Sequence, residues 1–303
     1  MKIFKIILLT TFITVVGCKV EKTVSETEGH KIQVQGHRGD RGNFPENTIE
    51  AFLSAIHKGV DVIELDVVIS KDRKVVVSHE PFMSSTYMSK PSGEAIAKKE
   101  EKEFNLYQMD YENIKQFDGG SRGNVNFPNQ KKIKTYKPLL DELFDVVEKE
   151  LAKKNLPTVK YNIEIKSEQS EYDISQPQPE EFIALIMQVI EEHHMENRIN
   201  IQSFDPVLLN AFHLKYPTFE VAYLVSTGNI QANLKLLEFK PQIYSPHFAL
   251  IKNQKTVDSI KAKNMKLIPW TVNEPSDINR MIQLQVDGII TDYPERILNN
   301  SKK

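Results

Sequence analysis

Charged and imidazole side chains recur at the ends of apolar runs in this sequence. His37 and Arg38 close one run, Glu64 and Asp66 stand two apart in a second, and His79 closes a third. Residues two apart on a strand project from the same face, so both carboxylates can point the same way. Carboxylates, imidazoles and a fixed cation at strand ends are the groups that a metal-assisted site needs to cleave a phosphate ester.

Glu64 and Asp66 are candidate ligands for a hard cation such as Ca²⁺ or Mg²⁺, which prefers oxygen ligands. Their run, residues 60–68, is apolar on both faces and therefore typical of a buried strand. A carboxylate buried there needs compensation, and a metal ion can supply it. Glu164 is a third candidate ligand. Its alternative role is an ion pair with Lys166 at the end of its own strand.

His37 and His79 are the candidates for proton transfer, because imidazole titrates near neutral pH and can either take or give a proton. Arg38 offers a forked donor suited to phosphate oxygens, and Lys166 offers a second cation for the same group. A salt bridge to one of the acids is the alternative role for Arg38. The two roles are compatible.

Short β-branched runs that alternate with amphipathic segments must position these side chains. The predicted strands are 32–36, 60–68, 75–79, 159–165, 199–204, 220–225, 243–245, 267–272 and 288–291. Alternating strands and helices over this length predict a parallel sheet closed as a (β/α)₈ TIM barrel. A doubly wound open sheet is the alternative.

One predicted strand is surplus to a barrel of eight. Only residues 70–74 separate the strand at 75–79 from the preceding one, which is too short for a parallel crossover. We therefore expect an antiparallel hairpin with Asp72 in its turn. Such a hairpin returns His79 to the neighbourhood of Glu64 and Asp66.

Capping signals mark the starts of several predicted helices. Asn47 is the expected N-cap of the first helix, with Glu50 three residues later. Asp205-Pro206 and Pro275 begin two later helices. Residues 81–137 interrupt the alternation of strands and helices, and an insertion of this length beside an active site is typical of a lid or small subdomain.

The first 30 residues precede the predicted barrel domain, residues 31–303. Residues 1–17 begin with a positive charge and continue with an apolar run at 6–16, which is shorter than the roughly 20 residues of a membrane-spanning helix. A glycine then precedes Cys18, the single cysteine of the chain. This pattern resembles a bacterial lipoprotein signal with lipid on Cys18 and a polar tether at 18–30. An ordinary secretory peptide and a short anchor are the alternatives.

Bulk composition limits the partners of the protein. The 303 residues carry a formal net charge of −2, so the chain lacks the basic footprint that a nucleic-acid partner leaves. The predicted partners are therefore a small-molecule substrate and, through the N-terminal lipid, a membrane. A single cysteine also excludes an intramolecular disulfide, so stability must come from packing.

In chain order, these residues resemble the glycerophosphodiester phosphodiesterase family. The matching segments span residues 35 to about 298 and are His37-Arg38-Gly39, Pro45-Glu46-Asn47-Thr48, Glu64-x-Asp66, Val76-Val77-Ser78-His79, Asn162-Ile163-Glu164-Ile165-Lys166, Gln202-Ser203-Phe204, Trp270-Thr271-Val272-Asn273 and Asp287-Gly288-Ile289-Ile290-Thr291-Asp292-Tyr293-Pro294. The resemblance implies a TIM barrel of the phosphatidylinositol-phospholipase-C-like type.

The resemblance also implies roles for individual residues. The resemblance assigns one divalent cation, Ca²⁺ or Mg²⁺, to the candidate ligands Glu64, Asp66 and Glu164. His37 and His79 take the family's acid/base positions. Arg38 and Lys166 take its phosphate-contacting positions, and Phe204 and Trp270 take the positions that line its pocket wall. The chain departs from the family at Glu80, where aspartate usually follows the second histidine.

The implied reaction converts a glycerophosphodiester to glycerol 3-phosphate and an alcohol. Either the glycerol 2-hydroxyl attacks phosphorus and water opens the cyclic product, or water attacks directly. Two alternatives remain. One is a phospholipase D-like enzyme acting on lysolipid or sphingolipid head groups, although such proteins generally rely on disulfides. The other is a non-catalytic lipoprotein that binds phosphoesters without turnover. Under each of these functions, the N-terminal pattern predicts an exported lipoprotein of the cell envelope.

Overall fold

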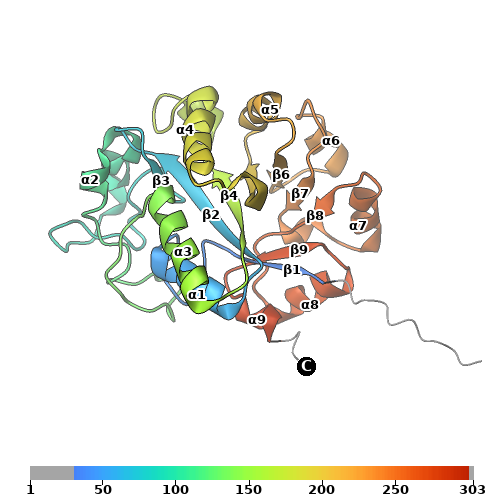
Figure 1. Ribbon diagram of the computed structural model, residues 1–303, viewed down its shortest axis with the longest axis horizontal. Coiled ribbons are helices and arrows are strands. Elements are labelled where there is room, and N and C mark those ends of the chain that lie inside the picture. The colour runs from blue at the N-terminus through green and yellow to red at the C-terminus, as the bar shows by residue number, and fades with distance from the viewer. Residues whose placement is uncertain (1–30, 300–303) are drawn as a thin grey trace, which may run out of the picture. The chain divides into compact units, whose positions relative to one another are not determined.

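The computed structural model describes residues 31–299, and their strands form one sheet that curves into a barrel (Figure 1). Its strands are β1 (Gln33–Gly36), β2 (Val62–Ile69), β3 (Val75–Val77), β4 (Lys160–Ile165), β5 (Ile199–Ser203), β6 (Glu220–Val225), β7 (Ile243–Pro246), β8 (Lys266–Leu267) and β9 (Gly288–Thr291). The spatial order is β8-β7-β6-β5-β4-β2-β1-β9, with every neighbouring pair parallel. All nine predicted strands are therefore present.

Backbone hydrogen bonds between the segment after β8 and β9 close the barrel. The Asp287 N–H donates to the Leu267 carbonyl at 2.9 Å, and the Ile290 N–H donates to the Pro269 carbonyl at 3.0 Å. The predicted strand 267–272 is wrong in its bounds, since β8 ends at Leu267. Beyond Leu267 the hydrogen bonds to β7 continue, since the Ile268 and Trp270 N–H groups donate to the Tyr244 and Pro246 carbonyls. Pro269, between them, has no N–H to donate on the side of β9.

Helices cover the outside of the barrel (Figure 1). They are α1 (Ile49–Lys58), α2 (Tyr111–Ile114), α3 (Leu140–Lys154), α4 (Pro179–Glu192), α5 (Pro206–Lys215), α6 (Ile230–Leu234), α7 (Gln254–Lys261), α8 (Pro275–Gln283) and α9 (Glu295–Leu298). Their apolar faces pack on the strands. The side chains of Phe144 on α3 and Tyr161 on β4, for example, are fully buried and meet edge to face at 5.0 Å.

The cap of α1 differs from the prediction. Thr48 is the N-cap, and its side chain accepts a hydrogen bond from the Ala51 N–H. Asn47 adopts a left-handed conformation with φ 55°, and its amide donates to the Asp66 carboxylate at 2.8 Å. Asn47 was mistaken for a cap because asparagine favours both positions. The predicted cap at Asp205 is confirmed, since its carboxylate accepts from the Val207 N–H.

The hairpin predicted between β2 and β3 is confirmed. β3 pairs antiparallel with β2, with Val67 opposite Val77 and Ile69 opposite Val75. Asp72 lies in the connecting turn, where it accepts from the Ser70 hydroxyl at 2.7 Å. The chain therefore folds back along β2 and places His79 near the carboxyl end of that strand.

The insertion at 81–137 packs on the outer side of this hairpin. Its apolar side chains form a cluster with Val68 of β2 and Val76 of β3, and the buried members from the insertion are Met83, Tyr87, Met88, Ile96, Leu106, Tyr111, Ile114 and Phe117. The insertion thus has its own small core, shared with the hairpin that carries His79. The sequence did not indicate this core, because these apolar residues follow no regular period.

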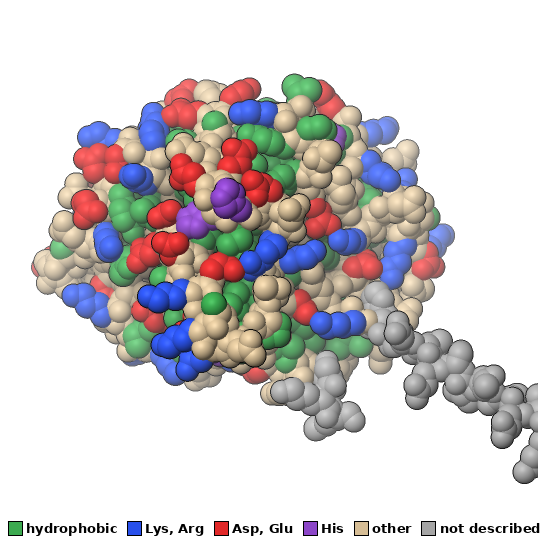
Figure 2. Space-filling model, viewed as in Figure 1, with side chains coloured by type: hydrophobic (Ala, Val, Ile, Leu, Met, Phe, Trp, Pro, Cys, Tyr) green, Lys and Arg blue, Asp and Glu red, His purple; other side chains and the backbone are tan. Residues whose placement is uncertain are grey.

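Within residues 31–299, no helix is both long and apolar enough to span a membrane. On the face shown in Figure 2, basic and acidic side chains are interspersed rather than separated into patches. The predicted signal peptide, the predicted lipidation site at Cys18 and the predicted tether lie outside the described residues.

Candidate active site

The parallel register of the barrel brings the predicted metal ligands to one end of the sheet. Asp66 on β2 lies opposite Glu164 on β4, and Glu164 lies opposite Gln202 on β5. Active sites of (β/α)₈ barrels form at this carboxyl end of the strands. A cavity of about 300 Å³ opens there, and it is lined by His37, Arg38, Arg41, Glu64, His79, Glu164, Lys166, Gln202, Phe204, Leu224, Trp270, Thr271 and Ile290.

Three buried carboxylates converge at the base of this cavity. Glu64, Asp66 and Glu164 are 1%, 0% and 7% exposed, and one oxygen from each lies within 4.8 Å of the others. The Asp66 Oδ1 atom accepts no hydrogen bond from any described residue, and the Lys166 Nζ atom lies 3.8 Å from it. A buried oxygen left without a donor among three carboxylates fits a bound divalent cation.

Burial and mutual repulsion make these acids unlike ordinary surface carboxylates. Burial raises the pKa of Glu64 well above its usual range, and the charges of Asp66 and Glu164 raise it further. Burial also raises the pKa of Glu164, despite the opposing charge of Lys166. A divalent cation would hold all three ionised, because a metal ligand must be deprotonated.

Asp66 is the exception within the acidic group. Burial acts to raise its pKa, but Arg38, His79 and Lys166 outweigh burial and hold the pKa of Asp66 well below its usual range. The Arg38 Nε atom lies 3.2 Å from Asp66 Oδ2. Lys166 donates to Glu164 at 2.6 Å, so the predicted Glu164–Lys166 ion pair is present alongside the candidate metal site.

Fixed donors set the orientation of Glu64. The Arg38 N–H donates to Glu64 Oε2 at 2.9 Å, and the Gln202 amide donates to Oε1 at 2.7 Å. Asn162 in turn donates to the Gln202 carbonyl oxygen at 3.0 Å and to Gln35 at 2.8 Å. Because Asn162 occupies the oxygen end of the Gln202 amide, the nitrogen end must face Glu64. A chain of amides inside the barrel thus orients one candidate ligand.

His37 belongs to a carboxylate–imidazole pair. Its Nδ1 lies 2.7 Å from Asp292 Oδ1, and Asn273 donates to the other oxygen of Asp292 at 2.6 Å. Burial acts to raise the pKa of Asp292, but His37 and Arg41 hold that pKa at about 2. Burial lowers the pKa of His37 and the charges of Arg38 and Arg41 lower it further, against the opposing effect of Asp292. A neutral His37 therefore donates Nδ1–H and leaves Nε2 free.

His79 also has a carboxylate partner. Its Nδ1 lies 3.2 Å from Glu80 Oε1. Burial acts to raise the pKa of Glu80, but the bond to His79 and the charge of Lys137 hold that pKa well below its usual range. Glutamate at this position therefore retains a contact with the histidine, although aspartate is usual in the family that the sequence resembles.

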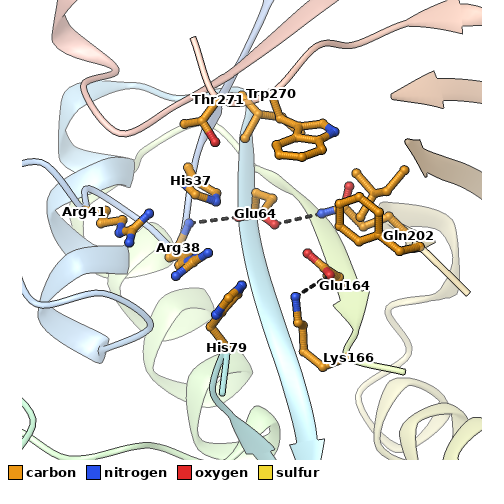
Figure 3. Close-up of a pocket in the computed structure, with 13 residues that line it drawn as sticks. His37, Arg38, Arg41, Glu64, His79, Glu164, Lys166, Gln202, Trp270 and Thr271 are labelled. Atoms are coloured by element: carbon orange, nitrogen blue, oxygen red, sulfur yellow. Dashed lines mark hydrogen bonds and ion pairs between the residues drawn. The ribbon is translucent and has the colours of Figure 1, made fainter. Parts of the chain in front are cut away.

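The candidate phosphate-binding cation Arg38 is held in place by Glu46. The Glu46 carboxylate accepts from Arg38 at 2.5 Å and from Arg41 at 2.8 Å. Both guanidinium groups line the cavity. In the view of Figure 3, Arg38 and both histidines lie on one side of Glu64, and Lys166 lies on the other.

The two candidate wall residues also meet in the structure. The rings of Phe204 and Trp270 pack edge to face with centroids 5.3 Å apart. The Trp270 indole donates to the Ser245 carbonyl at 2.8 Å, and Phe204 is 37% exposed. They supply an apolar surface beside an otherwise charged cavity.

The structure therefore brings all of the predicted site residues after Cys18 together and adds several that the sequence did not assign. Four of these added residues lie in segments that resemble the family: Glu46, Asn47, Gln202 and Asp292. Their position in those segments was the one indication in the sequence that they belong to the site. Arg41 carried no such signal. It reaches the cavity because the loop between β1 and α1 folds over the barrel end.

Comparison with known proteins agrees with this geometry. Residues 37–296 match the Glycerophosphoryl diester phosphodiesterase family. The chain belongs to this family. A relative from Caldanaerobacter subterraneus subsp. tengcongensis, named glycerophosphodiester phosphodiesterase, is 34% identical over 274 residues, which cover 90% of this chain and 99% of the relative. A relative of the same name from Bacillus altitudinis is 30% identical over 265 residues, covering 87% and 96%.

A solved structure supports the fold of this family member. It is an Oleispira antarctica phosphodiesterase in complex with the product sn-glycerol-3-phosphate. Its TM-score is 0.70 at 24% sequence identity, and the match covers 89% of this chain and 97% of the other. The predicted TIM barrel is thereby confirmed.

A direct binding measurement tests the candidate metal centre. We expect the chelator-treated protein to bind Mg²⁺ or Ca²⁺ in isothermal titration calorimetry and Asp66→Asn to bind neither. Gln202→Met removes one donor to Glu64 at similar volume, so we expect affinity to fall roughly tenfold to a hundredfold. Gln188→Met, an exposed change on α4, is the control. Unchanged metal affinity in Asp66→Asn would show that the three carboxylates are not the metal site.

Proposed function

We propose that this protein is a divalent-cation-dependent phosphodiesterase that hydrolyses glycerophosphodiesters to glycerol 3-phosphate and an alcohol. The observation that carries the proposal is the meeting of two imidazoles, two fixed cations and three carboxylates in one cavity. Membership of the family and the activities named for its relatives support the substrate class. Simple binding of a phosphoester does not need two imidazoles that each have a carboxylate partner.

Glu64, Asp66 and Glu164 are the proposed ligands of the cation, either Ca²⁺ or Mg²⁺. Their oxygens are hard donors, which both ions accept. When bound, the ion supplies positive charge that stabilises the charge developing on the phosphate in the transition state. The carboxylate positions are fixed beforehand by Gln202 and Asn47, so little reorganisation is needed.

His37 is the proposed general base. Its lowered pKa keeps it neutral near pH 7, and Asp292 holds the proton on Nδ1. The free Nε2 can then take a proton from the attacking hydroxyl, whether this belongs to the glycerol or to water. His79 is the proposed general acid that protonates the departing alcohol. In the cyclic route, the two roles exchange when water opens the ring.

Arg38 and Lys166 are the proposed phosphate contacts. Their positive charges lie on opposite sides of the carboxylates, so a phosphate bound above them can contact both (Figure 3). Phe204 and Trp270 are proposed to pack against the apolar carbon atoms of the substrate. A small polyol phosphate fits this combination of charge and aromatic surface.

Replacement of the base and removal of the metal test this mechanism. We expect His37→Ala to lower kcat on glycerophosphocholine roughly 10²–10⁴-fold, the range that general base catalysis contributes. We expect EDTA to abolish activity and Ca²⁺ or Mg²⁺ to restore it. His57→Ala changes an exposed histidine paired with Glu150 and should retain activity.

The same assay separates the alternative functions. Release of glycerol 3-phosphate from glycerophosphocholine supports the proposal. Release of choline from lysophosphatidylcholine alone would favour the phospholipase D-like alternative, and binding without turnover of either would favour a binding protein.

The pH dependence tests the environment of His37. Because the base must be deprotonated and its pKa is lowered, kcat/KM should rise with pH through a midpoint below 6.5. The Asp292 charge raises the pKa of His37, so Asp292→Asn should move this midpoint to still lower pH and also reduce kcat. Asp277→Asn changes a residue of α8 that pairs with Arg280 and does not line the cavity, and it should leave the midpoint in place. A midpoint that rises in Asp292→Asn would contradict the assignment.

We further propose that the protein is an exported bacterial lipoprotein of the cell envelope, anchored through lipid on Cys18. The support is the positive start, short apolar run and Gly-Cys pair in the first 18 residues. Expressed in a bacterium, the wild-type chain should lose residues 1–17 and gain acyl mass by mass spectrometry. Cys18→Ser should lack the acyl mass. A wild-type chain that keeps residues 1–17 would contradict the proposal.

A further inference from the structure

The imidazole of His79 lies beyond the end of the element that carries it. β3 ends at Val77, two residues before His79. Among the named strands β3 pairs only with β2, and the last backbone hydrogen bond of this pairing is donated by the Ser78 N–H to the Asp66 carbonyl at 3.0 Å. The hairpin therefore brings the chain to the site but cannot by itself fix the ring. The contacts that do so come from the insertion at 81–137 and from the residues just after it.

The segment directly after the insertion runs alongside β3. The Val77 N–H donates to the Pro138 carbonyl at 2.8 Å, and Val76 forms an antiparallel bridge with Leu139. This contact adds a short third strand-like segment beside the hairpin. The last residue of the insertion, Lys137, is thereby placed next to the segment that connects β3 to His79.

Lys137 fixes the backbone around His79. Its Nζ donates to the Ser78 hydroxyl at 2.7 Å, and that hydroxyl donates to the Glu80 carbonyl at 2.6 Å. The Lys137 residue is only 5% exposed. Because a buried ammonium group is retained where its charge and hydrogen bonds are used, this chain of contacts indicates a positioning role.

Tyr87 fixes the carboxylate that binds His79. The Tyr87 hydroxyl donates to Glu80 Oε2 at 2.9 Å, and Glu80 Oε1 lies 3.2 Å from His79 Nδ1. Tyr87 is 7% exposed and belongs to the apolar cluster of the insertion. The rotamer of Tyr87 is therefore set by packing, and the position of Glu80 follows from it.

We propose that the insertion is a positioning element for His79, in which Tyr87 and Lys137 hold Glu80 and Glu80 holds the imidazole. Glu80 accepts the Nδ1–H of His79, which leaves Nε2 directed at the cavity that His79 lines (Figure 3). The inference rests on the proposed role of His79 in proton transfer. It assigns a function to residues 81–137 that their sequence pattern did not indicate.

This arrangement explains the departure from aspartate at position 80. The Glu80 side chain must reach back to the ring of its chain neighbour and outward to Tyr87 at the same time. Aspartate is one methylene shorter and would lose one of the two contacts. The pair mirrors His37–Asp292, in which Asn273 takes the place of Tyr87 as the group that holds the carboxylate.

Substitutions in the network test the inference on glycerophosphocholine. Glu80→Gln keeps the shape of the side chain but removes its negative charge. With the amide NH2 turned toward Nδ1, the ring must carry its proton on Nε2. We expect kcat to fall roughly 10²–10⁴-fold with little change in KM. Tyr87→Phe removes one hydroxyl and should lower kcat about tenfold or more.

Tyr136→Phe is the matched control for Tyr87→Phe. It also removes a partly buried phenol–carboxylate hydrogen bond made by a residue of the insertion, here to Glu142 on α3 rather than to Glu80. We expect wild-type kcat for this variant. A general loosening of the insertion would lower kcat in both tyrosine variants, and equal losses would overturn the inference.

Long-range ¹H–¹⁵N spectra of the His79 ring supply a readout independent of activity. We expect the Nδ1–H tautomer in the wild-type protein and the Nε2–H tautomer in Glu80→Gln. Full turnover in His79→Ala would overturn the proposed role of His79 and this inference with it. Lost turnover in His79→Ala, with unchanged kcat and tautomer in Glu80→Gln and Tyr87→Phe, would overturn the inference alone.

Discussion

The repulsion among three buried carboxylates is the constraint on which the rest of this site depends. Glu64, Asp66 and Glu164 meet at the carboxyl ends of two adjacent strands, where little water reaches them. Such a group is stable only when positive charge and hydrogen-bond donors surround it. Arg38 and Lys166 supply part of that charge, and a divalent cation bound to the three carboxylates would supply the rest.

The need to stabilise these buried carboxylates also explains how the neighbouring side chains are arranged. Amides inside the barrel point their nitrogen ends at the acids, as Gln202 does toward Glu64 and Asn47 does toward Asp66. A second set of carboxylates, Asp292 and Glu80, lies farther out, where each binds an imidazole. The cavity thus has an inner group of acids suited to a metal and an outer group suited to proton transfer.

Much of this architecture could be predicted from local patterns. Short β-branched runs identified all nine strands, and the five-residue connection before Val75 identified the hairpin, because a parallel crossover cannot be that short. The predicted bounds of β8 were wrong because Pro269 lies within them and cannot donate a backbone hydrogen bond. Which neighbouring strand each residue faces depends on the folded sheet. Asn47 was wrong as a cap because its left-handed backbone serves Asp66, a residue distant in the sequence.

The sequence by itself determined the residue types, their alternation along strands and thus which side chains share a face. These properties follow from the geometry of a single strand, so candidate ligands and imidazoles could be identified without a fold. Only the tertiary structure decided which carboxylate binds which imidazole. Asp292, which follows β9, reaches His37, which follows the neighbouring strand β1, and Tyr87 reaches Glu80 from the insertion. Such pairings depend on side chains that meet through folding, and no local period encodes them.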